Sequence, residues 1–222
     1  MVIKILDLFC GLGGVAKGFQ SYLRQRNIKF EYYAIDVDGR ILLAHKILNP
    51  DSIVIRRDAY SFTDDELKQY DFIWASPPCE THSNLNLYNR KNLETFKKPD
   101  MRLWKLISRF YSLGKPFVVE NVKPYYGALI KPTARVGRHF LWSNLHIKDI
   151  DFDGVKFMDI KDDVDKLMEF HEVPKKVKFV LKYSKLRDAL RDMMYWKLAY
   201  SVAEQVIPQV VGKKIIQTIL PI

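Results

Sequence analysis

Cys79 is the residue of this chain whose side chain is best suited to nucleophilic chemistry. It ends the tetrapeptide SPPC at residues 76–79, which follows a short apolar run at residues 71–75. A free thiol has a pKa of about 8.5, and a nearby Lys or Arg lowers that pKa and increases the reactive thiolate. A lone cysteine is more often buried and inert. A turn with two prolines between a strand and a polar loop is an unusual place for burial, so the pattern favours a nucleophile.

Glu120 is a candidate acid for the same chemistry. It lies in the pentapeptide VVENV at residues 118–122, directly after an apolar run. Burial of a carboxyl group raises its pKa and lets it donate a proton, so we expect a raised pKa here. The alternative is a carboxylate at the end of a strand that is exposed or forms a salt bridge.

A glycine-rich turn and two aspartates form a third group of candidates. The segment DLFCGLGG at residues 7–14 joins an apolar run to a helical pattern, and glycines there let the backbone approach a ligand. Asp36 ends the second predicted strand, where an acid typically binds ribose hydroxyls. Asp58 ends the third. Both aspartates could instead be helix caps, and the spacing GxGxxG is absent.

The elements that must position these residues alternate between strand and helix over the first 120 residues. Such alternation predicts an α/β fold with a mostly parallel sheet, whose ligands bind at the carboxyl ends of the strands. We expect strands at residues 2–8, 31–36, 52–56, 71–75, 116–119 and 138–147, and helices at residues 15–26, 40–48, 101–113, 185–200 and 203–220. Each of the three motifs follows a predicted strand.

The three motifs, in this order, resemble those of the C5-cytosine DNA methyltransferases. DLFCGLGG is similar to the first motif of that family, SPPC to its PPC motif and residues 120–122 to its ENV motif, and Asn49-Pro50 also fits. The resemblance covers residues 1–142. It implies a Rossmann-like fold that depends on S-adenosylmethionine, and a small C-terminal insert.

The resemblance also implies a role for each matching residue. Cys79 would add to C6 of a flipped-out cytosine, Glu120 would hold N3, and C5 would then take the methyl group of S-adenosylmethionine. The residues implied to bind the cofactor, which leaves as S-adenosylhomocysteine, are Phe9, Gly11, Gly13, Asp36, Val37, Asp58 and Pro78. Those implied to lie near the substrate are Asn121 and, in a loop at residues 80–100 that would close over the base, Ser83, Arg90 and Lys91.

The match to the family is incomplete after residue 130. The family continues with QxRxR, whereas this chain has TARVGRHF at residues 133–140; Arg138 aligns best with the arginine that steadies the base, and Arg135 would serve a phosphate. A later GNxVxP-like motif has its nearest match at residues 203–210, without the Gly and the Asn. We therefore expect a catalytic domain at residues 1–147, a small target-recognition insert at 148–184 and returning helices at 185–222.

Charge and composition point to an anionic partner. Of a net charge of +10, residues 85–138 contribute +9, from 12 basic and 3 acidic residues that are interleaved with aromatics. We expect duplex DNA as partner, with restriction-modification among the roles. Transfer to tRNA, or a non-catalytic binding relative that needs a specificity partner, are the alternatives. We also expect a monomer in the cytoplasm, without export signal, membrane contact or metal site, because two cysteines and five histidines show no ligand spacing.

Overall fold

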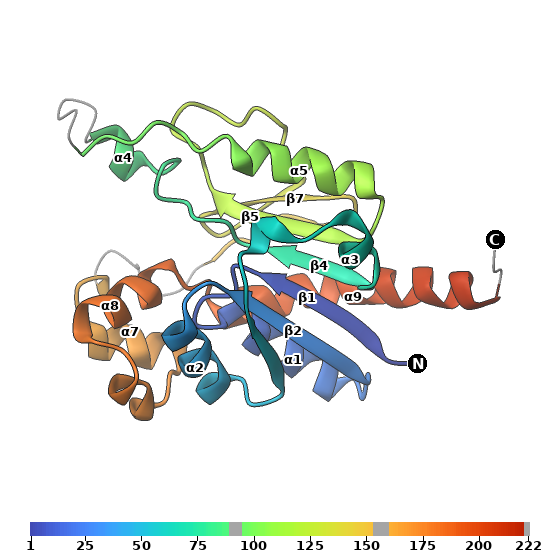
Figure 1. The fold of residues 1–222 in the computed structure, drawn as a ribbon, viewed down its shortest axis with the longest axis horizontal. Coiled ribbons are helices and arrows are strands. Elements are labelled where there is room, and N and C mark those ends of the chain that lie inside the picture. Colours follow the sequence, from blue (N-terminus) through green and yellow to red (C-terminus); the bar gives the residue numbers. More distant parts are fainter. Residues whose placement is uncertain (89–94, 153–159, 220–222) are drawn as a thin grey trace.

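Seven strands form a single sheet in the order β3-β2-β1-β4-β5-β7-β6. The computed structural model describes residues 1–88, 95–152 and 160–219. The first five strands are parallel, whereas β7 runs antiparallel to both β5 and β6. The strands are β1 (Ile3–Leu8), β2 (Phe30–Asp36), β3 (Ser52–Arg56), β4 (Phe72–Ala75), β5 (Phe117–Val122), β6 (Ala134–Val136) and β7 (His139–Ser143). The predicted α/β class with a mostly parallel sheet is confirmed (Figure 1).

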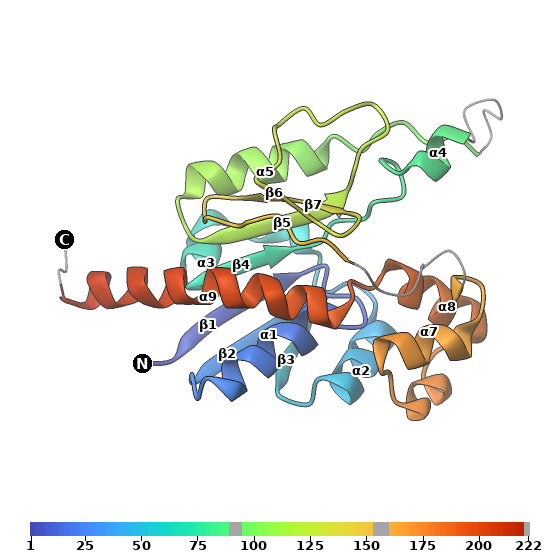
Figure 2. The same cartoon turned by 180° about the vertical axis from the view of Figure 1, so that it is seen from behind.

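Helices cover both faces of this sheet (Figures 1 and 2). The α-helices are α1 (Gly14–Gln25), α2 (Gly39–Leu48), α3 (Asp64–Lys68), α4 (Asn84–Tyr88), α5 (Arg102–Leu113), α7 (Val164–His171), α8 (Tyr183–Asp192) and α9 (Trp196–Ile219), and the short 3-10 helices are η1 (Ala59–Ser61) and η3 (Lys175–Phe179). Side chains of α1 and α9 share one apolar core with β1, and those of α5 share a second core with β4. Because the central strands are buried on both faces, they read as continuous apolar runs.

The last helix begins and continues differently from the prediction. The sequence suggested a break between residues 200 and 203, but α8 ends at Asp192 and α9 runs unbroken from Trp196. Met193 has an extended backbone and a buried side chain, which separates the two helices. Pro208 is tolerated inside α9 because it lies on the exposed face, where the freed carbonyl can meet water.

A small helical unit, made of α7, η3 and α8, packs beside the sheet rather than on it. Its apolar side chains form a third core with Leu12, from the glycine-rich turn, and with Ile41 and Ala44 of α2. The predicted boundary between residues 184 and 185 falls inside α8. Figure 1 shows this unit and α4 at the same end of the molecule, opposite the end toward which α9 projects. Within residues 1–88, 95–152 and 160–219, no helix has the length and apolar content needed to cross a bilayer.

Candidate active site

Cys79 lies in the turn that follows β4, at the carboxyl end of the sheet. Its carbonyl oxygen accepts hydrogen bonds from the backbone N–H groups of His82, at 2.9 Å, and Ser83, at 3.1 Å. The Ser83 hydroxyl donates to the carbonyl of Glu80, at 3.2 Å, so its side chain also belongs to this turn. Cys79 is half-buried, and Pro78 beside it is exposed. The turn therefore presents the thiol at the mouth of the sheet.

The Cys79 thiol carries its proton at neutral pH. Burial raises its pKa to about 12, the negative charges of Asp192 and Glu120 act in the same direction, and the positive charge of Arg138 opposes them. These effects place the thiol, Glu120 and the Arg138 side chain in one electrostatic neighbourhood, although they come from three separate segments. Lowering the thiol pKa in this site requires an additional positive charge or removal of a negative one.

Glu120 is buried, but its pKa is lower than that of a free carboxyl group, so the predicted direction was wrong. Burial alone would raise the pKa. His139 and a hydrogen bond from Ser76 oppose this effect, and so does the charge of Arg138. The distance from His139 Nδ1 to Glu120 Oε1 is 2.5 Å, and both side chains are about 90% buried. The carboxylate is thus stabilised by a partner that the sequence did not single out.

Arg138, predicted to steady the target base, lies just before β7, and its contact with a base stays a prediction. Its side chain is exposed, donates from Nη2 to the carbonyl of Arg191 at 2.8 Å, and lies 3.4 Å from His139 Nε2 through Nε. The turn at Gly137 and Arg138 precedes β7, so the first inward side chain of that strand is His139. The pairing of β7 with β5 brings His139 to Glu120, but the sequence motif pointed only to the arginines of this segment.

Asn121 contacts the backbone of the catalytic turn. Its Nδ2 donates to the Pro77 carbonyl at 2.8 Å, and its Oδ1 accepts from the Val122 N–H at 3.0 Å. Arg135, predicted near a phosphate, lies on β6 with an ion pair to Asp151 at 2.5 Å. The predicted contacts of Asn121, Ser83 and Arg135 with substrate stay predictions. Arg90 and Lys91 lie outside the described residues.

The glycine-rich turn stands on a buried polar network. Asn49 Nδ2 donates to the Gly13 carbonyl at 3.0 Å, and His45 Nδ1 lies 3.2 Å from the Gly11 carbonyl. Gly13 has φ +92°, and an added Cβ would lie 2.2 Å from Asn49 Nδ2, so no larger residue fits. Gly11 also has a positive φ, but space around its Cβ position is open. The turn is therefore tightly packed against Asn49 and His45 at Gly13, and has free space at Gly11.

The predicted cofactor residues at the ends of β1, β2 and β3 lie on neighbouring loops. Asp36 accepts the Gly11 N–H at 3.2 Å and the Asp38 N–H at 2.9 Å, while Val37 is 60% exposed. Asp58 accepts the N–H of Tyr60, as the first residue before η1, so the capping alternative holds for it in this structure. Phe9 contacts the Tyr60 ring, with centroids 4.9 Å apart.

Residues 203–210, the nearest match to the late family motif, lie in the middle of α9. Ala203 and Ile207 are buried in the core that α9 shares with α1. The chain beside the start of α1 is Met193–Trp196: a Cβ on Gly14 would lie 2.0 Å from the Met194 carbonyl. This segment packs against the start of α1 through its backbone. A backbone contact leaves no pattern of side chains, so the sequence did not predict it.

The helix α8 touches both halves of the site. Near its start, Lys185 Nζ pairs with Asp38 Oδ2 at 3.1 Å, beside the loop of Asp36 and Val37. At its end, the Arg191 carbonyl accepts from Arg138. The preceding helix is fixed by Lys17, whose Nζ contacts the carboxylate of Glu172 at 2.7 Å.

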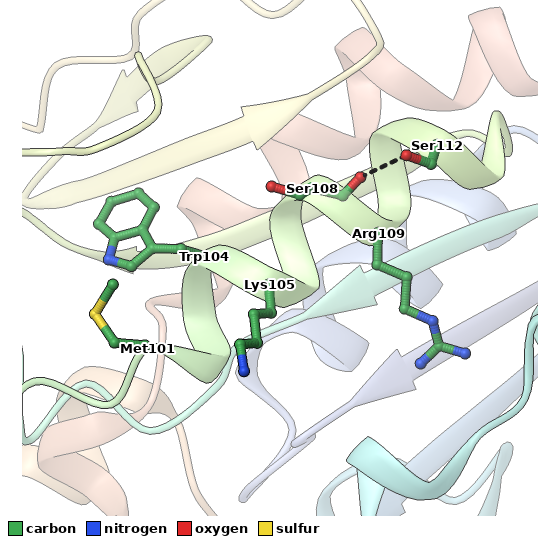
Figure 3. A pocket seen from close by; sticks show the side chains of 6 residues that line it. All are labelled: Met101, Trp104, Lys105, Ser108, Arg109 and Ser112. Carbon is green, nitrogen blue, oxygen red and sulfur yellow. Dashed lines mark hydrogen bonds between the residues drawn. The ribbon is translucent and has the colours of Figure 1, made fainter.

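An open hollow along α5 lies apart from these groups (Figure 3). Its lining consists of Met101, Trp104, Lys105, Ser108, Arg109 and Ser112. The labelled side chains come from one helix and its start, and Arg109 is already paired with Asp64. None of the residues predicted for the site lines this hollow.

Comparisons with known proteins agree with the motifs. The family model for C-5 cytosine-specific DNA methylase matches residues 3–129. The Type II methyltransferase M1.BsuMI of Bacillus subtilis (strain 168) is 30% identical over 141 residues, covering 54% of this chain and 31% of that protein. The DNA (cytosine-5)-methyltransferase PliMCI of Paracentrotus lividus is 25% identical over 138 residues, covering 55% and 8%. The chain thus spans less than a third of the length of these curated relatives.

Solved structures share the fold over nearly the whole chain. The Entamoeba histolytica methyltransferase EhMeth has a TM-score of 0.59 at 9% identity, covering 95% of this chain and 99% of that one. The S. pombe Dnmt2 methyltransferase has a TM-score of 0.55 at 9% identity, covering 94% and 99%. At this identity the likeness establishes the fold, and it confirms the predicted methyltransferase architecture.

Proposed function

The chain belongs to the C-5 cytosine-specific DNA methylase family, and from this membership we propose that it transfers a methyl group from S-adenosylmethionine to C5 of a cytosine in DNA. The observation that carries the proposal is geometric: β4 and β5 are neighbouring parallel strands, and Asn121, next to Glu120, donates at 2.8 Å to the Pro77 carbonyl in the turn that carries Cys79. A thiol nucleophile beside a carboxyl group is the pair that addition to C6 and proton handling at N3 require.

The residues at the glycine-rich turn suit the cofactor. The open space above Gly11 admits the methionine portion, and the exposed Val37 with the ring of Phe9 offers apolar surface to adenine. Asp36 would exchange its present backbone hydrogen bonds for the ribose hydroxyls, and Asp58 and Pro78 would border the site. When bound, the cofactor supplies an electrophilic methyl group and a positive sulfonium charge. A positive charge beside Cys79 would lower the pKa of the thiol.

The chain's own residues account for the remaining steps. The Cys79 thiol would give its proton to the Glu120 carboxylate, Sγ would bond to C6, and N3 would take up that proton from Glu120, so that C5 gains the electron pair of the former double bond. C5 takes the methyl group, a base or water removes the C5 proton, and N3 returns its proton as the Sγ–C6 bond breaks. A cytosine inside a duplex cannot reach this turn, so we propose that it is flipped out.

Two parts of the molecule would contact the duplex: the loop after Cys79 and the helical unit. The side chain of Asn86 joins the two ends of that loop, because its Nδ2 donates to the Lys97 carbonyl at 2.7 Å and to the Thr81 carbonyl at 3.1 Å. On the helical unit, Phe179 is 91% exposed and Tyr183 63% exposed. Exposed lysines surround them: Lys175, Lys176, Lys178 and Lys182. Cationic groups around exposed rings suit a phosphate backbone and unpaired bases.

A binding assay tests this surface. Replacing Lys175, Lys176 and Lys182 by Ala should make duplex binding less sensitive to salt. The slope of log K against log salt concentration should become less steep by about three, or about one for each cation removed. A matched triple variant replaces Lys29, Lys68 and Lys213, which are equally exposed but lie elsewhere on the surface. Equal salt slopes for the two variants would contradict the assignment.

The central experiment follows labelled methyl from S-adenosylmethionine into unmethylated duplex DNA, with tRNA as competitor and bisulfite sequencing of the product. We expect label at cytosine C5 with wild type, none with Cys79→Ala, and full transfer with Ser112→Ala, a surface control. Transfer by Cys79→Ala at the wild-type rate would overturn the covalent mechanism. Label on tRNA but not on DNA would overturn the substrate.

A further inference from the structure

His139 faces Glu120 across the β5–β7 ladder. The register pairs His139 with Val122 and Leu141 with Glu120, so the two polar side chains are diagonal neighbours on one face. Their contact of 2.5 Å is buried on both sides. Resting on the proposed function, we propose that His139 is a positioning residue of methyl transfer, which holds Glu120 in place and shares with it the proton that N3 receives.

The contact from Arg138 defines which nitrogen of His139 carries the proton in the neutral ring. Arg138 Nε donates toward His139 Nε2 at 3.4 Å, so Nε2 is the acceptor and Nδ1–H is left to donate to Glu120 Oε1. A line of three groups from three backbone positions therefore runs from the exposed guanidinium to the buried carboxylate. Arg138 acts on Glu120 through His139 as well as by its charge.

The proton balance of the addition step gives this pair its function. With His139 protonated and Glu120 ionised, the Nδ1 proton passes to the Glu120 carboxylate, and the carboxyl group then gives this one proton to N3. The imidazole ends neutral and the thiolate charge disappears into the Sγ–C6 bond. On elimination of Cys79 the proton returns from N3 through Glu120 to Nδ1. An ionised Glu120 with no adjacent donor would instead repel the lone pair of N3.

Charged and titratable groups approach the pair from every neighbouring segment. They are Cys79 from the turn after β4, Arg138 before β7, Asp192 at the end of α8 and, near Arg138, the buried His171 of α7. Of these, the Asp192 carboxylate raises the pKa of the Cys79 thiol. A pH profile of a His139 variant must therefore be compared with the wild-type profile in the same Cys79 and Asp192 background.

Two variants separate positioning from proton sharing. His139→Asn keeps an N–H donor near the position of Nδ1 but cannot titrate, while His139→Ala removes both functions. In single turnovers at saturating cofactor, we expect a loss of about 10-fold for His139→Asn and about 100-fold or more for His139→Ala, in the range of general acid–base contributions. The pH profile of the rate should differ from that of wild type in both variants, because neither can supply a proton from this position, while cofactor Kd stays unchanged. Equal rates and profiles in all three proteins would overturn the proposal.

An NMR measurement tests the hydrogen bond without any activity. The imidazole 15N shifts should report a proton on Nδ1 and a bare Nε2 in the neutral ring, and Glu120→Gln should change the Nδ1 signal. A proton on Nε2 instead would overturn the proposal. Should the wild type transfer no methyl group at all, the proposed function fails, and the 15N signals alone then decide whether His139 holds Glu120.

Discussion

The side-chain amide of Asn121 donates to the carbonyl of Pro77 at 2.8 Å, so the strand that carries Glu120 also holds the turn that carries Cys79. Asn121 is 1% exposed, and its Oδ1 accepts a backbone N–H of the same strand. The nucleophile and the carboxyl group are thereby fixed relative to each other by one buried amide.

Replacing Asn121 by Ala should uncouple the turn from the strand. The Pro77 carbonyl would lose a buried partner, which costs about 1–3 kcal/mol in free energy of unfolding. We expect kcat to fall at least 10-fold while cofactor Kd stays within twofold, measured by methyl transfer and cofactor titration. Asn144→Ala is the matched control, because Asn144 makes the same kind of backbone bonds near the other end of β5. An equal fall of kcat in the control would contradict this coupling.

The two glycines of the turn should respond differently to Ala. In Gly13→Ala the new Cβ meets Asn49 and His45 at 2.2–2.7 Å, so we expect a loss of several kcal/mol in stability, seen in urea titrations. In Gly11→Ala the Cβ meets no atom of the chain, and only the positive φ costs about 1 kcal/mol. That methyl would, however, fill space assigned to the cofactor. Normal cofactor affinity in Gly11→Ala would show that this space is not used.

Asp192 should hold back ionisation of the Cys79 thiol. Its carboxylate raises the pKa of that thiol, next to the larger effect of burial. Asp192→Asn should therefore lower the thiol pKa and speed alkylation by iodoacetamide at pH 9, with Asp188→Asn as control on the same helix. Alkylation of Cys79→Ala gives the background from Cys10, which is buried. An unchanged rate in Asp192→Asn would mean that the carboxylate does not act on the thiol.

The network below the glycine-rich turn should make stability depend on acid pH. Burial lowers the pKa of His45 to about 4, below 6.5 for a free imidazole. Between these values the unfolded chain binds more protons than the folded chain, so stability is complete above pH 6.5 and falls toward pH 4, by up to about 3 kcal/mol. His45→Gln should flatten this part of the profile of urea midpoints, and His146→Gln, at an exposed position, should not. Parallel profiles would contradict the assignment.

The site residues that could be predicted from the sequence are those near the ends of predicted strands. Asp7, Asp36, Cys79 and Glu120 each lie in or directly after a strand, and the parallel order brings these strand ends to one edge. The partner of Glu120 could not be found this way, because His139 reaches it through the antiparallel register of a strand 19 residues further along. The same contact reversed the expected pKa shift of Glu120. Desolvation can be inferred from an apolar run, but a neighbouring imidazole cannot.

In the helical unit, α7 and η3 were not predicted, whereas most of α8 lies within the helix predicted at residues 185–200. Its helices are short, and their apolar faces fit α2 and Leu12 rather than the sheet, so no strand–helix alternation announces them. The break before α9 depends on Met193, whose extended backbone follows from its burial in that same core. Tertiary packing determines both the position of the helical unit and the break before α9, and neither can be inferred from local helix propensity.

The ties at the two ends of α8 constrain how such an enzyme can be re-engineered. A designer who exchanges the whole helical unit for another segment would remove the Lys185–Asp38 pair and the Arg191–Arg138 bond together, unless the graft ends before residue 183. Chimeras joined within residues 172–182 keep α8 together with the sheet and exchange only the part of the helical unit that precedes the junction. The modular border of this protein, by that criterion, lies inside the helical unit rather than at its edge.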